Sequence, residues 1–259
     1  MDLGIAGRTA LLTASSRGLG RACAEALAAE GVDVVINGTD PGNLDRAARE
    51  ITETHGVAVT PVQADINTPE GRALLLETCP DPDILVNNNW GPPPGDWESF
   101  EYEDWLEAVE SNMLAPIMMI KGVVGGMRAR KFGRIVNVTS QMVKSPFSVM
   151  GLSAGARTGL TGASKALSRE VVRDNVTINN LLPERIDTER QVFMARSRAE
   201  DAGITYEEAR AEIVASIAAG RMGRPEEFGA ACAFLCSAQA GYISGQNLQL
   251  DGGSYRGTF

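Results

Sequence analysis

Histidine is almost absent from this 259-residue chain, and tyrosine is missing from its whole middle part. The one histidine is His55, and no tyrosine occurs between Tyr102 and Tyr206. A Ser-His-Asp triad, a Cys-His pair and a His-rich metal site all need an imidazole beside their other members. His55 precedes Gly56 where a helix is expected to end, a position typical of a C-terminal cap. The composition therefore argues against these mechanisms, and we expect no metal site.

The chain also lacks basic character, long apolar runs and paired cysteines. Lys plus Arg total 24 against 33 Asp plus Glu, a net charge of −9, which argues against nucleic acid or an anionic membrane as a partner. Its apolar runs fall far short of the roughly 20 residues that span a bilayer, and no signal-peptide pattern is present. Cys232 and Cys236 have helical spacing in an Ala-rich segment, which favours core packing. We expect a cytoplasmic protein that acts on a small molecule.

Apolar runs rich in β-branched residues alternate with longer amphipathic segments. The runs 32–36 and 134–138 are mostly apolar on both faces, as in a parallel sheet covered by helices on each side. Right-handed crossovers then give an α/β fold, a Rossmann-type doubly wound parallel sheet in three layers, as a single domain over 1–259. Strands are expected near 9–14, 32–37, 57–63, 83–87, 133–139, 175–182 and 247–250, and helices near 18–30, 41–55, 68–79, 102–130, 151–173, 206–219 and 225–238.

Residues 184–222 depart from this alternation. The segment is helical in pattern and rich in Arg and Glu, and it follows the sixth expected strand. An insertion at that place is well positioned to cover a ligand crevice. We expect a helical substrate lid over 184–222, with a solvated pair of charged helices as the alternative.

The most informative segment is Thr13-Ala14-Ser15-Ser16-Arg17-Gly18-Leu19-Gly20, between a short apolar run and a helix. A strand that turns sharply into a helix aims unpaired N–H groups and the positive end of the helix dipole at one point, which suits a pyrophosphate. Glycine-rich turns are common, so an ordinary strand-to-helix turn is the alternative.

Polar residues follow three of the other expected strands, at 63–66, 87–92 and 137–140, and Asn112 lies in a long expected helix. Together with Gly7-Arg8-Thr9-Ala10 and Asp251-Gly252-Gly253, these motifs in this order resemble the short-chain dehydrogenase/reductase family over essentially the whole chain. The resemblance implies an oxidoreductase with a nicotinamide dinucleotide cofactor.

The resemblance also implies roles for particular residues. Asn112 matches the active-site asparagine of the family and Ser140 its catalytic serine. The implied cofactor contacts are Thr13, Ser15, Ser16, Arg17, Gly18, Leu19 and Gly20 around the pyrophosphate and adenosine ribose, Asp65 and Ile66 beside the adenine, Asn87 near the ribose, and Arg157 and Pro183 toward the nicotinamide.

The choice between the two nicotinamide cofactors depends on the end of the second strand. It reads Ile36-Asn37-Gly38-Thr39, without an acidic residue to bind a ribose 2′-hydroxyl. Arg17 supplies a cation near the adenosine ribose. We therefore predict NADP(H) rather than NAD(H); a surface arginine without a ligand is the alternative for Arg17.

The departures from the family pattern concern the reacting end. The family places a tyrosine thirteen residues after its serine and a lysine four residues later, where this chain has Ser153 and Arg157. In the usual mechanism the phenol protonates the carbonyl oxygen, a step worth about 10²–10⁴-fold. Serine cannot replace it unaided. Arg157 keeps a cation that could hold the nicotinamide ribose, but it cannot donate a proton near pH 7.

Two further departures fall at the same end. The usual Asn-Asn-Ala-Gly reads Asn87-Asn88-Asn89-Trp90, and the usual Pro-Gly reads Pro183-Glu184. We predict that Trp90, Ser153, Arg157 and Glu184 converge on one rebuilt pocket. A decayed site is the alternative, and a structural ion pair of Glu184 with a neighbouring arginine is the alternative for that residue.

The sequence thus predicts an atypical NADP(H)-dependent oxidoreductase acting on a small carbonyl, alcohol or imine. The proton would come from Ser140 with water, from Lys144 or from Glu184; a cationic iminium would need none and would be held by Trp90 with Glu184 as counter-ion. A lyase, isomerase or cyclase with Glu184 as base and Arg157 as oxyanion clamp, and a non-catalytic nucleotide-binding subunit, remain as alternatives.

We also expect a homo-oligomer, a tetramer, as the resemblance implies. Small or flexible residues on the two long expected helices would allow close packing between subunits, with packing inside the chain as the alternative. These residues are Ala115, Met118, Met119, Gly155, Ala156 and Gly159.

Overall fold

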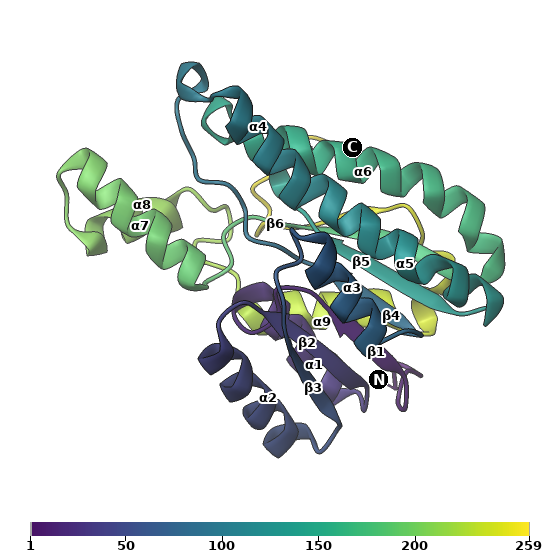
Figure 1. The fold of residues 1–259 in the computed structure, drawn as a ribbon. Helices are drawn as coiled ribbons and strands as arrows, with labels where there is room; N and C mark the ends of the chain where they lie inside the picture. The colour runs from purple at the N-terminus through teal and green to yellow at the C-terminus, as the bar shows by residue number, and fades with distance from the viewer. Residues whose placement is uncertain (1, 259) are drawn as a thin grey trace.

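The computed structural model describes residues 2–258 and centres on a seven-stranded parallel sheet (Figure 1). The strand order is β3-β2-β1-β4-β5-β6-β7, so the order reverses between β1 and β4. This confirms the predicted fold, and each strand ends within two residues of its expected bounds. The strands are β1 (Thr9–Leu12), β2 (Asp33–Gly38), β3 (Val59–Gln63), β4 (Ile84–Asn87), β5 (Gly133–Val138), β6 (Val176–Pro183) and β7 (Asn247–Leu250).

Local signals in the sequence set where the helices begin and end. Asp40 caps a helix by accepting a hydrogen bond from Asn43 N at 2.6 Å, and Gly56, with φ of +70°, ends the same helix directly after His55. The helices are α1 (Gly18–Ala29), α2 (Pro41–His55), α3 (Pro69–Thr78), α4 (Tyr102–Val109), α5 (Ala115–Ala129), α6 (Gly151–Val171), α7 (Glu189–Ala202), α8 (Tyr206–Ala215) and α9 (Pro225–Cys236).

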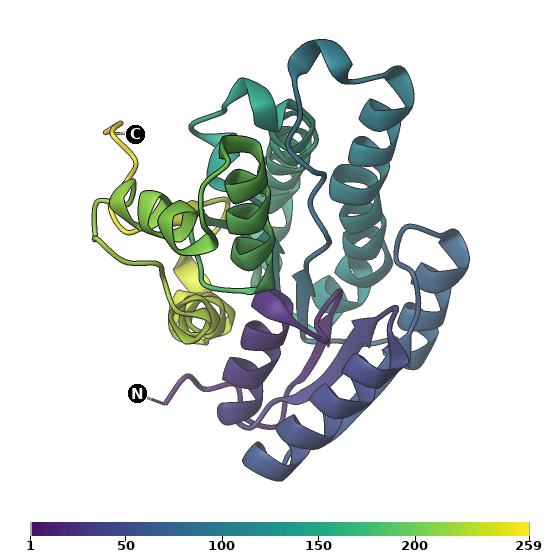
Figure 2. The same ribbon diagram turned by 90° about the vertical axis from the view of Figure 1, so that its left-hand side faces the viewer.

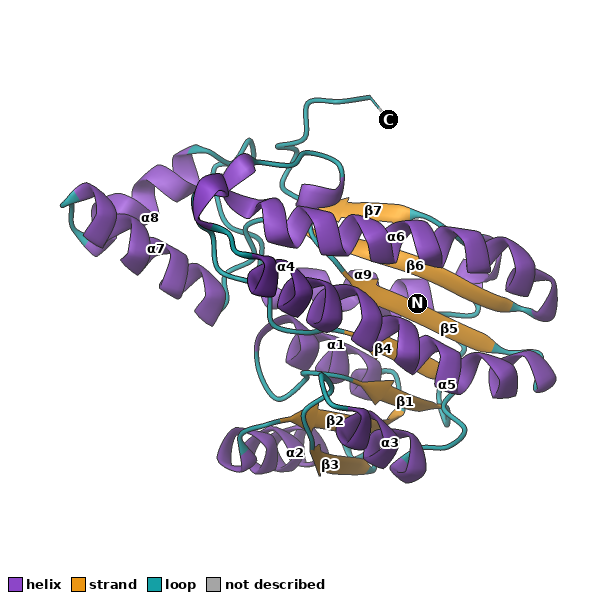
Figure 3. Cartoon of the chain, turned by 45° about the horizontal axis from the view of Figure 1, so that its top comes forward, coloured by secondary structure: helices purple, strands orange, loops and turns teal. Residues whose placement is uncertain are grey.

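Alternate residues of each strand face opposite layers of helices, as the period of two requires. Ala10 and Leu12 join a cluster with α1, α2 and α9, whereas Leu11 joins a cluster with α3, α5 and α6. Figure 3 shows helices on the two sides of the sheet. Cys232 and Cys236 are buried in the first cluster as free thiols, which confirms their predicted role in the core.

The expected single helix over 102–130 is wrong in one respect. A π-helical turn at Glu110–Leu114 separates α4 from α5. Pro116 explains the break, because it has no N–H to donate to the carbonyl of Asn112 and its ring crowds that carbonyl. Single π turns inside helices are frequent at functional sites.

Helices α7 and α8 form the helical excursion predicted over 184–222, and they project from the body of the molecule (Figures 1 and 2). They share a small apolar core made by Ala195, Ile213, Ile217 and Met222. A parallel bridge between Ile186 and Gly223 joins the two ends of the segment. The pair is therefore a packed unit, and its role as a lid stays a prediction.

The residues predicted to form a subunit interface pack mainly inside the chain. Ala115, Met119 and Ala156 are buried. Gly159 faces Met113, whose sulfur would lie 2.6 Å from an added Cβ, and Gly155 faces Trp105 in the same way at 3.2 Å. Close internal packing accounts for most of these small residues without a subunit interface. Of the six residues, Met118, at 37%, and Gly155 remain exposed; the tetramer itself stays a prediction.

None of the helices within residues 2–258 is both long and apolar enough to cross a membrane.

Candidate active site

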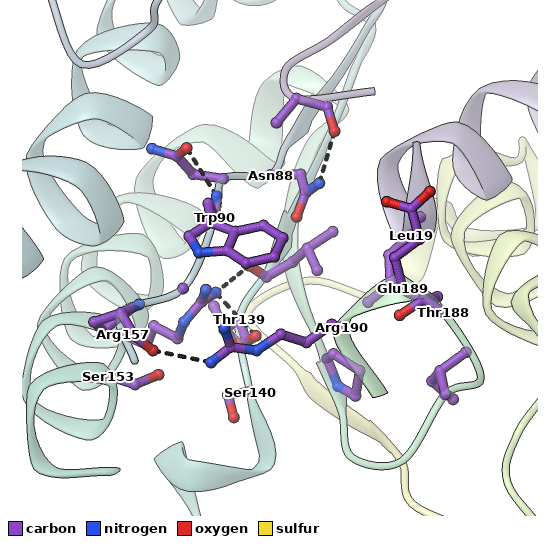
Figure 4. A pocket seen from close by; sticks show the side chains of 18 of the residues that line it. Leu19, Asn88, Trp90, Thr139, Ser140, Ser153, Arg157, Thr188, Glu189 and Arg190 are labelled. Atoms are coloured by element: carbon purple, nitrogen blue, oxygen red, sulfur yellow. Dashed lines mark hydrogen bonds between the residues drawn. The ribbon is translucent and has the colours of Figure 1, made fainter. Parts of the chain in front are cut away.

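A cavity of about 570 Å³ opens at the carboxyl ends of the strands. The loops after β1, β2, β3, β4, β5 and β6 contribute to its wall, together with residues 147–150 and the first turn of α7 (Figure 4). This is the edge at which the strand order reverses, where ligands of doubly wound sheets bind. Of the predicted site residues, the wall includes Ser16, Arg17, Gly18, Leu19, Asp65, Ile66, Trp90, Ser140, Ser153, Arg157, Pro183 and Glu184.

Thr13, Ser15 and Gly20 shape the turn after β1 without lining the cavity. The Thr13 hydroxyl donates to Asn88 O at 2.7 Å, and the Ser15 hydroxyl donates to Leu12 O at 2.9 Å. A Cβ on Gly20 would lie 2.3 Å from Ala14 O. These positions were predicted as cofactor contacts. In the structure the hydroxyls of Thr13 and Ser15 hold the turn in place, and Gly20 allows the close approach of Ala14 O.

The start of α1 presents a free helix N-terminus to this cavity. Its N-cap residue, Arg17, makes no side-chain capping bond, and the first turn holds no acidic residue. Gly18 has a φ of +57°, and a Cβ added there would meet nothing within 4 Å. The unpaired N–H groups of this turn and the open space beside Gly18 suit an anion.

The end of β2 carries no carboxylate in the wall. The Asn37 amide donates to Val62 O at 3.1 Å and Ala64 O at 2.8 Å, so this side chain joins neighbouring loops. A Cβ on Gly38 would lie 2.6 Å from the Ser16 hydroxyl oxygen. The Ser16 hydroxyl therefore lies beside the end of β2, the position from which an acidic residue binds the ribose 2′-hydroxyl in NAD-binding folds.

Asn87, expected near the ribose, and Asn112, expected at the active site, do not line the cavity in this conformation. Asn87 Nδ2 donates to Asn137 Oδ1 at 2.9 Å and to Pro116 O at 3.3 Å. Asn112, in the π-helical turn, donates to Trp90 O at 3.3 Å. The Oδ1 atoms of Asn87 and Asn112 are buried without a partner. Asn87 therefore ties the end of β4 to β5 and α5, and Asn112 positions the loop after β4.

Trp90, Ser153, Arg157 and Glu184 all line the same cavity, which confirms that the four departures converge (Figure 4). They come from the loop after β4, from α6 and from the end of β6. Trp90 is 58% exposed, whereas Ser153 is 3% exposed. These three segments are far apart in the sequence, so the fold brings the four residues together.

The Arg157 guanidinium is buried against the end of β5. Its Nη1 donates to Val138 O at 2.8 Å and Thr139 O at 2.9 Å, while its Nε has no partner. Burial lowers the pKa of Arg157 to about 10, and the positive charge of Arg190 adds to the shift. Arg157 is therefore a buried cation that fixes the end of β5.

Glu184 has a raised pKa, first because burial disfavours its charge and then because of Asp251. Arg185, Gln141 and Ser254 oppose the shift. Its Oε2 is buried without a hydrogen-bond partner, and no ion pair of Glu184 with Arg157 or Arg185 is formed in the described chain. The carboxyl group is suited to hold a proton at a higher pH than an ordinary glutamate.

Ser140 and Lys144 lie on different sides of the loop after β5. The Ser140 side chain lines the cavity, and its hydroxyl accepts a hydrogen bond from Met142 N at 3.2 Å. Lys144 instead lies over the Tyr255 ring at 5.6 Å and borders a separate depression. Lys144 as a proton donor was therefore a wrong expectation, because its ammonium group points to the C-terminal segment.

Arg190 was missed by sequence reasoning. Its Nη2 donates to Pro92 O at 3.0 Å, 98 residues away in the chain, and its guanidinium lies 5.2 Å from the Trp90 ring centre and 5.4 Å from that of Phe193. Burial lowers its pKa. No spacing in the sequence marks this arginine, because its partners come from the loop after β4.

Comparisons with known proteins agree with this geometry. A family model described as Enoyl-(Acyl carrier protein) reductase matches residues 13–255. The 3-oxoacyl-(acyl-carrier-protein) reductase FabG of Escherichia coli (strain K12) is 32% identical over 253 residues, which cover 96% of this chain and 98% of that protein. The chain belongs to the short-chain dehydrogenase/reductase family.

Two further relatives are similar over their whole length. The NADPH-dependent reductase BacG of Bacillus subtilis (strain 168) is 31% identical over 254 residues, covering 96% of this chain and 98% of that protein. The crystal structure of L-sorbose reductase from Gluconobacter frateurii, complexed with NADPH and L-sorbose, has a TM-score of 0.94 and 32% identity, and covers 99% of this chain and all of that one. The cavity thus lies in a short-chain dehydrogenase/reductase fold.

Proposed function

We propose that this protein is an NADP(H)-dependent oxidoreductase that reduces a small carbonyl compound, or oxidises the corresponding alcohol, without a catalytic tyrosine. The observation that carries the proposal is the single cavity that joins the free N-terminus of α1 to Trp90, Ser153, Arg157 and Glu184. Relatives named as NADPH-dependent or complexed with NADPH support the cofactor.

The described residues fit NADP(H) at the adenosine end. The turn at Gly18 offers open space and unpaired N–H groups for a pyrophosphate. The Ser16 hydroxyl and the Arg17 guanidinium lie in the wall near the end of β2, which itself carries no carboxylate. Glu189 pairs with Arg17 at 2.7 Å, so a 2′-phosphate would have to displace it. A donor set without an acid at this position favours NADP(H) over NAD(H).

The reacting end must provide a proton from a group other than a phenol. When bound, NADPH supplies the hydride for the carbonyl carbon, and the oxygen then needs one proton. Glu184 lines the cavity with a raised pKa and an unpartnered oxygen, so its protonated form is a fitting general acid. Ser140 provides a hydroxyl in the same wall to orient the oxygen.

Trp90 bears on the choice between a carbonyl and a cationic iminium. The ring already has the Arg190 guanidinium over it at 5.2 Å, and Arg157 adds a second cation to the wall. A positively charged substrate would be repelled by both groups. This arrangement favours a neutral or anionic carbonyl substrate.

The test is turnover of NADPH with a panel of small ketones, aldehydes, oxo acids and imines, followed by the loss of the reduced nicotinamide absorbance. We expect oxidation of NADPH by at least one carbonyl compound and a much lower rate with Glu184→Gln. Arg196→Gln is the matched control, since Arg196 is exposed on α7 outside the cavity wall. Tight binding of NADPH without turnover of any compound would instead support the non-redox or non-catalytic alternatives.

A further inference from the structure

Two guanidinium groups lie in the cavity wall without an acidic partner. Arg157 is 7% exposed, and burial lowers the pKa of Arg190. Neither forms an ion pair within the described residues 2–258. Buried charges are ordinarily paired, because removal from water is costly for an isolated ion. An anion that enters the cavity would supply the missing counter-charge.

The contacts of Arg190 hold its guanidinium in place and leave most of its donors free. One Nη2 bond to Pro92 O and the rings of Trp90 and Phe193 fix the group at the start of α7. A guanidinium has five N–H donors in a planar fork that matches a carboxylate or phosphate. Figure 4 shows Arg190 reaching across the cavity toward Arg157. The fork is therefore preorganised for an anionic group.

Arg157, buried against the end of β5, adds a second positive charge to the cavity wall. Its Nη1 is committed to the two carbonyls at the end of β5, while its Nε has no acceptor. Both guanidinium groups belong to the same cavity wall, where Figure 4 shows them side by side, and the charge of Arg190 lowers the pKa of Arg157. Repulsion between them is relieved when an anion binds, so both favour the same ligand.

The acidic residues of the wall, Asp65, Glu184 and Glu189, form no ion pair with Arg157 or Arg190 in the described chain. Asp65, just after β3, accepts a hydrogen bond from Asn67 N at 2.9 Å. Glu189 is engaged by Arg17 at 2.7 Å. Glu184 lies next to Arg185 and has a pKa raised by burial, which favours its neutral form. An uncompensated positive charge therefore remains at Arg157 and Arg190, beside the residues assigned to the reacting end.

We propose that Arg190, supported by Arg157, forms a binding site for an anionic group of the substrate, and that the substrate is a carbonyl compound bearing a carboxylate or a phosphate. Arg190 contacts the anion and determines specificity, and Arg157 acts through the field that it adds. This inference rests on the proposed function for the carbonyl, whereas the anion site can be measured without turnover.

The test uses isothermal titration calorimetry on the full chain saturated with NADP⁺, which blocks the adenosine end and allows no reduction. The probes are acetoacetate and its uncharged ethyl ester, and dihydroxyacetone phosphate and uncharged dihydroxyacetone. We expect one of the anions to bind at least about tenfold more tightly than its neutral counterpart. The acetoacetate and phosphate arms distinguish the two sources of charge.

Substitution then assigns the preference to Arg190. Arg190→Gln should remove most of the preference for the anion and leave the neutral probe unchanged, Arg190→Lys should restore part of it, and Arg196→Gln should leave it intact. Equal binding of charged and neutral probes to the parent protein, or equal weakening of both by Arg190→Gln, would overturn the anion site. If the protein reduces only neutral carbonyl compounds, the anion site is overturned and the proposed function stands. If anions bind but no compound is turned over, the anion site stands and the proposed function is overturned.

Discussion

The Arg17 guanidinium donates to the Glu189 carboxylate at 2.7 Å and thereby joins the turn after β1 to the first residue of α7. Both side chains are about half exposed or more, at 48% and 64%, so the pair contributes little to stability, roughly 0–1 kcal/mol. The ion pair instead affects the binding of the cofactor. The same guanidinium is our candidate for the 2′-phosphate, so Glu189 and NADP(H) compete for it.

Arg17→Ala should weaken NADPH binding by roughly 1–2 kcal/mol, the scale of a charge-assisted hydrogen bond, and should leave NADH nearly unchanged. Fluorescence titration of the parent and the variant with both nucleotides measures the difference. A parent protein that prefers NADH, or an equal loss for both nucleotides, would contradict the assignment.

Glu189→Gln tests the competition from the other side. Removal of the carboxylate frees Arg17, so NADPH should bind a few-fold more tightly, and the gain should shrink at high salt because the groups are exposed. Affinity for NADH should not change. A loss of NADPH affinity in this variant would mean that the ion pair positions Arg17 for the cofactor and does not compete with it.

Glu184 should set the pH dependence of the reaction. Burial raises the pKa of Glu184. Its carboxyl group therefore stays protonated to a higher pH than that of an ordinary glutamate, whose pKa is about 4.3. Reduction that uses the protonated group should therefore fall as pH rises through that pKa, and alcohol oxidation should rise over the same range. In Glu184→Gln the rate should drop at least about tenfold and this limb of the pH profile should vanish.

Stability provides the control for the Glu184 variant. A raised pKa in the folded state means that the charged carboxylate is disfavoured by folding, so its stability cost is present above that pKa and disappears as the group is protonated at lower pH. The glutamine variant should therefore melt at or above the temperature of the parent at neutral pH. A lower melting temperature would assign Glu184 a structural role.

The fold and much of the cavity follow from the sequence because their signals are local. Two-sided apolar runs identify parallel strands, and residues directly after parallel strands must share one edge, which is why Trp90 and Glu184 line the same cavity. Side-chain direction is not local. Asn87 turns to the Asn137 amide inside the sheet, and Arg190 takes its place from rings and a carbonyl in another loop. The π-helical turn likewise depends on how Pro116 fits within a packed helix.

Light scattering at micromolar concentration should give the mass of a homotetramer, as the family resemblance implies. The structure shifts the expected contact away from the small residues of α6 to apolar side chains exposed on α4 and near α5: Leu106 at 49%, Leu114 at 42% and Met118 at 37%. Such exposed apolar groups are candidates for burial between subunits. Leu114→Glu with Met118→Glu should lower the mass, and a monomeric parent would refute the prediction.

The double change Ser153→Tyr with Arg157→Lys separates a rebuilt pocket from a decayed one. In a decayed site the restored pair would be neutral or would raise carbonyl reduction, since Ser140 remains in the wall to orient a phenol. In a rebuilt site a phenol at the buried position 153 fills cavity space that the substrate needs. Lysine at position 157 also removes the Nη1 atom that donates to both Val138 O and Thr139 O. We expect kcat/KM for the substrate found in the panel to fall at least about tenfold while NADPH affinity, measured by fluorescence, is kept.

The single Ser153→Ala change is the control for loss of the hydroxyl alone and should lower kcat/KM less. An unchanged or higher rate in the double variant would show that the parent pocket is a relic of the tyrosine-dependent site.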